Sequence, residues 1–268
     1  MSVLRAGLIG AHISATRLPR ALELLCQEAG WSLAFDLIDT SDMAGFDFAA
    51  RVDAARADGW TGVTVTHPWK PQARAYAGGT MVGAAAASLG ASTLLTFAPL
   101  AGHNTDFTGA LAALPQRDLG RVLVIGAGGV SEALVPALKS LGARDIHVTD
   151  LDPAKAQDLA TRCAVTATDD IEIARQMDGL INATPVGMGY HPGLPLAPAL
   201  IGPQSWAFDA VYTPPDTAFL QAARAAGLNT ISGFELYNHM AKGTFTAYTG
   251  IEIDEEAAVI RLDALRPD

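Results

Sequence analysis

A glycine-rich turn lies in the middle of the chain, between an apolar run and a helical pattern. Arg121-Val-Leu-Val-Ile125 leads directly into Gly126-Ala-Gly-Gly-Val-Ser-Glu-Ala133. Gly126 permits a tight turn, Gly128 lets the backbone approach a pyrophosphate, and Ala133 allows close helix–strand packing. Free amide groups at the start of the helix also favour phosphate binding. The sequence therefore predicts a dinucleotide site, with phosphate contacts expected at Gly126, Ala127, Gly128, Gly129 and Val130.

An acidic residue completes the nucleotide-binding pattern. The next apolar run, Ile146-His-Val-Thr-Asp150, ends in a carboxylate. It follows the turn by about 20 residues, where an acid accepts hydrogen bonds from the ribose of NAD. Asp150 would repel the 2′-phosphate of NADP, and no arginine follows it directly. We therefore predict NAD as the cofactor, with NADP less favoured, and expect Leu151 to contact it. A plain strand–turn–helix with a surface aspartate is the alternative.

These residues need strands and helices to position them, and the hydrophobic pattern predicts both. Short apolar runs alternate with segments of helical spacing, which indicates an α/β fold with a largely parallel sheet. We expect strands at 4–9, 32–38, 62–66, 121–125, 146–150, 179–182, 206–209 and 229–232. We expect helices at 18–29, 48–58, 108–114, 131–141 and 235–249.

The predicted elements fall into two domains. Residues 1–107 are expected to form an N-terminal α/β substrate domain, which a C-terminal helix within 235–268 completes. Residues 108–234 are expected to form a doubly wound Rossmann domain that binds NAD(P). We place the substrate cleft between the two domains, a frequent location for small-molecule sites.

The composition argues against several function classes. The 268 residues carry a formal charge of −10, and such an acidic chain is not expected to bind nucleic acid or an anionic membrane surface. Cys26 and Cys163 are far apart and in no metal-ligand spacing, so we expect neither a disulfide framework nor a zinc site. The N-terminus lacks the pattern of a signal peptide. We therefore expect a cytoplasmic protein.

Two further segments sit where a predicted strand ends and a loop begins, as functional residues often do. They are Gly62-Val-Thr-Val-Thr-His-Pro-Trp-Lys70 and Gly102-His-Asn-Thr-Asp-Phe-Thr-Gly109. With Asn182-Ala-Thr-Pro-Val-Gly-Met188 and Asp209-Ala-Val-Tyr-Thr-Pro214, they make the chain resemble the shikimate and quinate dehydrogenase family over nearly its whole length. Asp150 makes it look most like the NAD-using quinate/shikimate branch.

The resemblance implies a reaction and a role for each matching residue. It implies interconversion of a ring secondary alcohol and ketone, as in aromatic amino acid biosynthesis, with Lys70 and Asp106 as the catalytic pair and no metal. The chemistry agrees, because alcohol oxidation needs a base for the hydroxyl proton, and partial desolvation lowers the pKa of a lysine. Implied substrate contacts are Thr16, Thr66, Ser92, Tyr212 and Met240. Implied cofactor contacts, besides those already given, are Asn182, Ala183, Thr184, Ala210 and Gly233.

The chain departs from the family pattern in the substrate half. Leu18 replaces a hydroxyl that holds the substrate carboxylate, Leu22 replaces a histidine, and Met240 replaces a glutamine. Thr64 and Ser92 stand where the family has asparagine. Each lost hydrogen bond to a bound polar group costs about 1–3 kcal/mol, which favours a shifted substrate, such as a cyclic polyol without a carboxylate. Compensating contacts are expected among His12, Ser14, Arg17, Arg20 and His239.

Two other functions stay open beside a shikimate- or quinate-type enzyme. One is a non-catalytic dinucleotide-binding regulator, against which Lys70 and Asp106 argue. The other is a folate-linked dehydrogenase on the same two-domain plan, against which the Asn-Thr-Asp run argues. The expected partner is a small cyclic hydroxy acid or polyol, and the expected state is a monomer or a homodimer.

Overall fold

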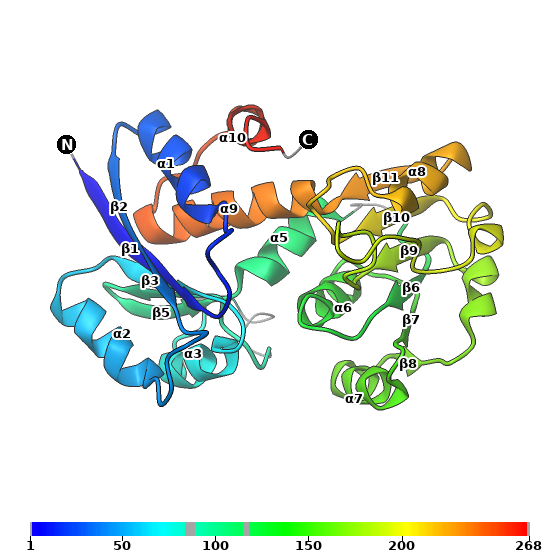
Figure 1. The fold of residues 1–268 in the computed structure, drawn as a ribbon, viewed down its shortest axis with the longest axis horizontal. Helices are drawn as coiled ribbons and strands as arrows, with labels where there is room; N and C mark the ends of the chain where they lie inside the picture. The colour runs from blue at the N-terminus through cyan, green and yellow to red at the C-terminus, as the bar shows by residue number, and fades with distance from the viewer. Residues whose placement is uncertain (1, 84–88, 115–117, 267–268) are drawn as a thin grey trace. The chain divides into compact units, whose positions relative to one another are not determined.

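The chain forms two compact units in a computed structural model that describes residues 2–83, 89–114 and 118–266. Unit 1 comprises residues 2–105 and 240–265, and unit 2 comprises residues 106–239 and Arg266. Helix α9 (Gly233–Thr249) begins in unit 2 and ends in unit 1 (Figure 1). The domain limits expected after residues 107 and 234 stay a prediction.

Unit 1 is built on a mixed five-stranded sheet in the order β2-β1-β3-β4-β5. The first three strands are parallel, whereas β4 and β5 are antiparallel to their neighbours. The chain therefore leaves β1, β2 and β3 at one common edge of the sheet. The strands are β1 (Val3–Gly10), β2 (Ser32–Asp39), β3 (Gly62–Val65), β4 (Leu94–Phe97) and β5 (Leu100–His103).

Helices cover both faces of the unit 1 sheet (Figure 1). On one face, α2 (Phe48–Ala57) and α3 (Lys70–Ala77) pack against buried strand residues such as Val63 and Val65. Alternation along β3 turns Thr64 to the other face, where its hydroxyl lies 2.8 Å from the Tyr248 hydroxyl of α9. That face also carries α1 (Leu18–Glu28) and α10 (Glu255–Asp263), which contact each other. Residues 240–265 therefore complete the hydrophobic core of unit 1, whose sheet is built by residues 3–103.

Unit 2 contains a six-stranded sheet in which every neighbouring pair is parallel. The order is β11-β10-β9-β6-β7-β8, so the chain builds outward in one direction from β6 and then in the other from β9. This is the doubly wound Rossmann order, and the predicted α/β class is confirmed. The strands are β6 (Arg121–Ile125), β7 (Asp145–Thr149), β8 (Thr166–Ala167), β9 (Gly179–Asn182), β10 (Trp206–Asp209) and β11 (Asn229–Ser232).

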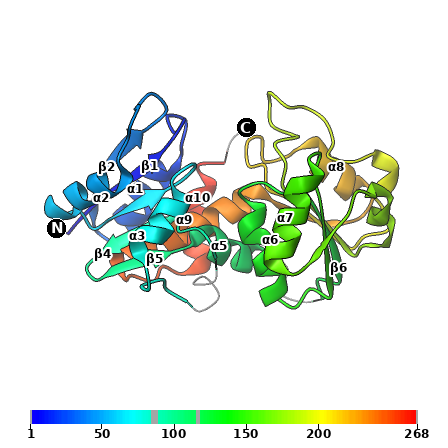
Figure 2. The same cartoon turned by 90° about the horizontal axis from the view of Figure 1, so that it is seen from below.

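The crossovers of unit 2 cover the two faces of its sheet. Helices α6 (Ser131–Ser140) and α7 (Pro153–Cys163) lie side by side (Figure 2). The buried side chains Leu123 and Leu180 belong to a second cluster, which includes Phe219 and Leu220. That cluster is built by α8 (Ala218–Ala225) and two 3-10 turns, η1 (Ile171–Gln176) and η2 (Pro198–Leu200). Helix α5 (Thr105–Ala113) precedes β6 in the chain, and all of it except Thr105 belongs to unit 2.

Most predicted element bounds agree with the structure, and some differ by a few residues. Strands β6, β9, β10 and β11 have the predicted limits. Thr66 and Asp150 were expected at strand ends, but β3 stops at Val65 and β7 at Thr149, so both residues begin the following loops. Helix α5 starts at Thr105 rather than Thr108, which brings Asp106 into its first turn.

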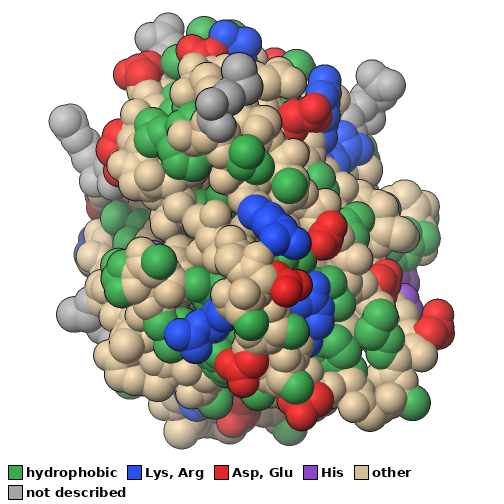
Figure 3. All heavy atoms as spheres, turned by 90° about the vertical axis from the view of Figure 1, so that its left-hand side faces the viewer, with side chains coloured by type: hydrophobic (Ala, Val, Ile, Leu, Met, Phe, Trp, Pro, Cys, Tyr) green, Lys and Arg blue, Asp and Glu red, His purple; other side chains and the backbone are tan. Residues whose placement is uncertain are grey.

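Among the helices of the described residues, none has both the length and the apolar character needed to cross a bilayer. The face in Figure 3 intersperses acidic and basic side chains with hydrophobic ones. A hollow lined by Arg20, Glu23 and Phe35 lies between α1 and β2. It sits beside the amino half of β2, away from the sheet edge where the chain leaves β3 for Lys70.

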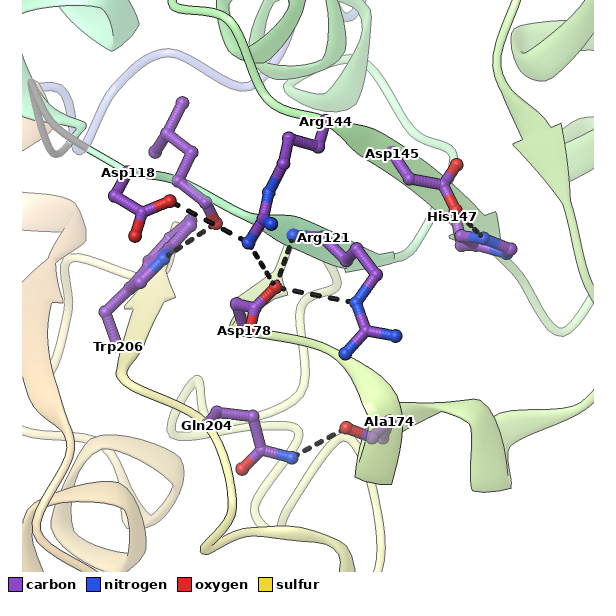
Figure 4. Close-up of polar contacts among 10 residues, drawn as sticks. Asp118, Arg121, Arg144, Asp145, His147, Ala174, Asp178, Gln204 and Trp206 are labelled. Atoms are coloured by element: carbon purple, nitrogen blue, oxygen red, sulfur yellow. Dashed lines mark hydrogen bonds and ion pairs between the residues drawn. The ribbon is translucent and has the colours of Figure 1, made fainter.

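A carboxylate closes the amino-terminal edge of the unit 2 sheet (Figure 4). Asp178 accepts a hydrogen bond from the Arg121 backbone amide (2.8 Å), and the Arg144 guanidinium lies 3.4 Å from the same oxygen. These contacts lower the pKa of Asp178, the backbone hydrogen bond most of all. Nearby, Trp206 Nε1 donates to the Leu119 carbonyl (3.3 Å). This edge is therefore occupied by contacts within the unit.

We predict that Asp178→Ala lowers the free energy of unfolding at pH 7 by about 1 kcal/mol, because it removes an acceptor from a backbone amide. Since the folded pKa lies below the ordinary value, this stabilisation is present above about pH 4 and disappears as the pH falls through the folded pKa. Denaturant unfolding at pH 7 and pH 3 checks this. Asp118→Asn is the control, because asparagine tolerates the left-handed φ of +42° at this position, and the exposed pair of Asp118 with Arg144 at 3.8 Å should contribute little. Equal effects of both variants would contradict the prediction.

Candidate active site

The carboxyl edge of the unit 2 sheet carries the predicted cofactor residues. Strands β6 and β9 are neighbours, yet the chain continues from them in opposite directions across the sheet. Ligands of doubly wound sheets bind where the strand order reverses, beyond the carboxyl ends of the strands. Here Gly126 follows β6, and Ala183 and Thr184 follow β9. The segment predicted to bind the pyrophosphate and the segment predicted to pass the nicotinamide side therefore flank the reversal point.

The glycines of the turn differ in what surrounds them. Gly126 has a φ of +101°, and a Cβ atom there would lie 2.8 Å from the Ala183 carbonyl oxygen. A Cβ on Gly128 or Gly129 would meet no described atom within 4 Å. Gly126 is thus required by the fold itself, whereas Gly128 and Gly129 leave their backbone open to a ligand.

Asp150 organises the turn from the neighbouring strand. Its carboxylate accepts hydrogen bonds from the amides of Ala127 (2.7 Å) and Asp152 (2.8 Å). No side chain of the described residues caps the start of α6 at Val130, so its first amides suit an anion. Leu151 is fully exposed. The open glycines, the uncapped helix and an acid beside them fit a bound NAD, whose phosphates would meet the turn and whose ribose would meet Asp150.

A buried carboxylate joins the loops after β9 and β10. Asp209 Oδ1 accepts from Asn182 Nδ2 (2.9 Å) and from the Val211 amide (3.0 Å), and Oδ2 accepts from the Thr217 hydroxyl (2.5 Å). Asn182 Oδ1 accepts in turn from the Thr184 amide (3.1 Å). Both Asp209 and Asn182 have no exposed surface. Burial raises the pKa of Asp209 to about 6. We did not predict Asp209 as a site residue, although its place at a strand end resembles that of Asp150.

The remaining predicted contacts of this half lie on the same edge. The Ala210 amide donates to the Asn182 carbonyl (2.8 Å), and a Cβ on Gly233 would lie 2.5 Å from the Ala210 carbonyl oxygen. Tyr212 stacks on Tyr237 with ring centroids 5.7 Å apart. The structure therefore brings Asn182, Ala210 and Gly233 together, and Tyr212 lies two residues after Ala210 in the loop that follows β10. Their contacts with a cofactor or substrate stay predictions.

In unit 1, Lys70 is the first residue of α3 and is half-buried. The loop before it is fixed at three points. The Thr66 amide donates to the Ile9 carbonyl (2.9 Å), and the Trp69 amide donates to the Thr66 carbonyl (2.9 Å). Trp69 Nε1 donates to the Thr40 hydroxyl (2.8 Å). These bonds hold the Lys70 backbone at the edge of the sheet where β1, β2 and β3 end.

Asp106 lies in the first turn of α5 and is 9% exposed. The Thr105 amide, directly before it, donates to the Thr93 hydroxyl (2.7 Å). The Ser92 amide donates to the Lys70 carbonyl (3.0 Å). The backbone at Lys70 and the residue preceding Asp106 are thus both bonded to the segment Ser92–Thr93. That the lysine and aspartate side chains act together stays a prediction.

The predicted substrate residues differ in how far their side chains are already engaged. Ser92 is fully buried, and its hydroxyl lies 3.0 Å from the Leu94 carbonyl oxygen and 2.9 Å from that of His103. A substrate contact at Ser92 would require these bonds to be exchanged. Thr16 accepts from the Leu18 amide at 3.3 Å. The half-buried residues of this set are Thr16, Thr66, Tyr212 and Met240.

Within residues 2–83, 89–114 and 118–266, no group of three or more His, Cys, Asp or Glu side chains is placed to hold a metal ion. The expectation of a reaction without metal stays a prediction.

We predict opposite outcomes for two glycine variants. Gly126→Ala should lower the melting temperature, because the new methyl would press on the backbone of Ala183 at a φ that L-residues rarely adopt. Gly128→Ala should melt like the parent chain but bind NAD at least about tenfold more weakly, since its methyl would occupy the approach to the pyrophosphate. Thermal unfolding and NAD titration check both. Normal NAD binding by Gly128→Ala would contradict the placement of the phosphates.

We predict that Asp209→Asn becomes more stable relative to the parent chain as the pH rises from 4 to 7. The raised pKa means that the folded state favours the protonated carboxyl. The stabilisation from this proton is complete below about pH 4 and is lost as the pH rises through 6, by about 3 kcal/mol at most. Asparagine is always neutral and keeps the shape of the acid. Denaturant unfolding between pH 4 and 7 measures this, and parallel stability curves for the two chains would contradict it.

Comparison with known proteins places the chain in a family. The profile described as "Shikimate / quinate 5-dehydrogenase" matches residues 110–186. A quinate/shikimate dehydrogenase (NAD(+)) of Corynebacterium efficiens is 36% identical over 269 residues, covering 93% of this chain and 94% of that protein. Quinate dehydrogenase from Corynebacterium glutamicum in complex with NAD superposes with a TM-score of 0.90 at 32% identity, covering 98% of this chain and 100% of that one.

A second solved structure carries the other dinucleotide. Shikimate 5-dehydrogenase from Thermus thermophilus, in complex with NADP(H) and shikimate, has a TM-score of 0.83 at 28% identity, with 97% of this chain and 99% of that chain covered. The identity to the Corynebacterium efficiens protein extends over both units described above. Together with the strand order and the loops that follow β6, β7 and β9, this shows that the chain belongs to the shikimate/quinate dehydrogenase family.

Proposed function

We propose that this chain is an NAD-dependent oxidoreductase that interconverts a secondary alcohol and a ketone on a small hydroxylated ring. The observation that carries the proposal is the carboxyl edge of the unit 2 sheet. There the open glycine turn, the Asp150 carboxylate and the Asn182–Asp209 loops surround the reversal point of the strand order. The family relatives named above act on shikimate and quinate, which are rings of this kind.

The preference for NAD rests on charge. Asp150 is the first residue after β7, the second strand of unit 2, and Asp152 is the N-cap residue of α7, which follows. Two carboxylates at the expected ribose position would repel a 2′-phosphate, whereas a free ribose hydroxyl can donate to them. The relative from Corynebacterium glutamicum binds NAD, in agreement with this preference. NADP stays the less favoured cofactor.

Bound NAD would supply the hydride acceptor, and the residues of this chain would handle the substrate and its proton. Lys70 is half-buried at the start of α3. Its amine can accept the proton of the substrate hydroxyl when the alcohol is oxidised and can return it when the ketone is reduced. The hydrogen bonds of Thr66 and Trp69 hold the loop before it, so the backbone that carries the lysine side chain is fixed in place.

Asp106 complements the lysine. It is almost buried in the first turn of α5, where the helix dipole favours a negative charge. A carboxylate held this way can accept a hydrogen bond from the reacting hydroxyl and orient it toward the lysine. We propose that orientation, rather than proton uptake, is the role of Asp106.

A second candidate substrate class is favoured by two engaged hydroxyls. Ser92 is bonded to backbone carbonyls, and Thr64 lies within hydrogen-bond distance of Tyr248. Neither side chain is available to a ring acid without giving up these contacts, and Leu18 offers no hydroxyl. The second candidate is therefore a cyclic polyol without a carboxylate. A monomer or a homodimer is compatible with either substrate.

Turnover assays with NAD and NADP test the function. We expect reduction of NAD, followed by nicotinamide absorbance, with at least one member of a panel of shikimate, quinate and carboxylate-free cyclic polyols. The value of kcat/KM with NAD should exceed that with NADP by about tenfold or more. No turnover on the whole panel would reject the function. A preference for NADP would reject the role of Asp150 alone.

Lys70→Met separates an enzyme from a dinucleotide-binding regulator. We expect kcat to fall by about 10²- to 10⁴-fold with an unchanged dissociation constant for NAD, since the variant loses a proton-transfer group. Lys139→Met, on the exposed last turn of α6, is the matched control and should keep full activity. A Lys70→Met variant with normal kcat would contradict the proposed base.

A further inference from the structure

The loop after β1 is held by an acid from the end of β2. Asp39 Oδ1 accepts from the His12 amide (3.0 Å), and Asp39 Oδ2 accepts from the Ile13 amide (3.1 Å). The His12 amide also lies 2.7 Å from the Ser41 hydroxyl oxygen. His12 itself has a φ of +57°, a conformation that residues other than glycine seldom adopt. Asp39, at the end of β2, and Ser41, in the loop after it, therefore hold the backbone of His12 in this conformation.

The same contacts indicate which atom is the donor in each hydrogen bond of this network. Hydrogen bonds from Ser41 and from two backbone amides lower the pKa of Asp39 to about 2, those from Ser41 contributing most. Asp39 is therefore a carboxylate that can accept hydrogen bonds but cannot donate them. The Ser41 hydroxyl lies 2.5 Å from Asp39 Oδ1, so its single hydrogen points to the acid.

The assignment fixes the tautomer of the histidine. Ser41 Oγ lies 3.2 Å from His12 Nδ1, and its hydrogen is already donated to Asp39. His12 Nδ1 must then carry the hydrogen and donate it to Ser41. In a neutral imidazole the other ring nitrogen, Nε2, is consequently an acceptor. His12 is exposed, and no atom of the described residues hydrogen-bonds to its Nε2.

His12 lies at the same edge of the unit 1 sheet as the proposed catalytic residue Lys70. His12 follows β1, Asp39 ends β2, and Lys70 follows β3, so all three lie at the edge where these parallel strands end. The Ala11 amide, directly before His12, donates to the His67 carbonyl (2.9 Å) in the loop that leads to Lys70. The exposed imidazole and the lysine are thus presented by adjacent, hydrogen-bonded loops.

We propose that His12 is a specificity-determining residue whose Nε2, oriented through Ser41 and Asp39, accepts a hydrogen bond from a hydroxyl of the ring substrate. The inference rests on the proposed function and narrows its substrate class. An acceptor nitrogen selects a hydroxyl, because a carboxylate has no hydrogen to donate to it. The network therefore favours substrates with a free hydroxyl at the ring position that faces the loop after β1.

His12→Asn tests the inference with little risk to the fold. Asparagine tolerates the left-handed conformation, and its amide nitrogen can replace Nδ1 as the donor to Ser41, but it has no counterpart of Nε2. The probes are quinate and a set of quinate analogues, each lacking one ring hydroxyl that is not oxidised. We expect kcat/KM for quinate to fall by about tenfold or more, mainly through KM, with unchanged affinity for NAD. Asp42→Asn, in the exposed loop after β2 that also carries Ser41, is the matched control and should change nothing.

The analogues decide the outcome. For one analogue, the one without the contacted hydroxyl, the parent chain and His12→Asn should have equal kcat/KM. Ser41→Ala, which releases Nδ1, should show a loss in the same direction on quinate and none on that analogue. An equal loss on every analogue, or no loss on quinate, would overturn the role of His12. If the parent chain does not turn over quinate, the same test uses the ring of the panel above that it does oxidise, together with analogues of that ring. Absence of turnover on the whole panel would instead reject the proposed function, so the two failures are distinguishable.

Discussion

The direction of parallel strands is the constraint on which both units depend. Strands that run the same way must end at the same edge, so the loops that follow them are neighbours regardless of their separation in sequence. In unit 2 this brings Gly126, Asp150 and Asn182 to one edge, and in unit 1 it brings His12, Asp39 and Lys70 to another. The hydrogen-bonded core fixes the strands, and the strand ends then fix the polar groups. The polar residues proposed to act on the cofactor and the substrate therefore lie at these two sheet edges.

Much of the fold was predictable from the amino-acid sequence because buried parallel strands leave a clear pattern. Runs such as Arg121–Ile125 and Trp206–Asp209 are apolar on both faces and short, and their limits were predicted correctly. The hairpin of β4 and β5 was not predicted. Its strands mix polar with apolar residues, since buried Thr96 alternates with Leu95, and they lie in a stretch with no helical or alternating period. Helix α3 was missed because Pro71 follows Lys70 directly and reads as a break, although proline suits the first turn of a helix.

The candidate site was less predictable, for a different reason. The glycine turn and Asp150 have a spacing that a sequence displays, whereas the network of Asp39, Ser41 and His12 joins residues 27 to 29 positions apart. Asp209 was overlooked because a fully buried acid is unusual. Its burial becomes understandable once Asn182 and Thr217 are seen to donate to it. Contacts across loops, rather than motifs, define these residues, and only the folded chain reveals them.

Helix α9 has a consequence for how this protein is made. Unit 2 is almost continuous in sequence, but unit 1 needs residues 240–265 from the far end of the chain, where Tyr248 covers Thr64 and Phe245 is fully buried. During synthesis from the N-terminus, domains fold as their residues emerge. The strands made first must then wait, with one face uncovered, while the nucleotide-binding half is produced and folds. The strands of residues 3–103 thus acquire their complete core only after the nucleotide-binding half has been made.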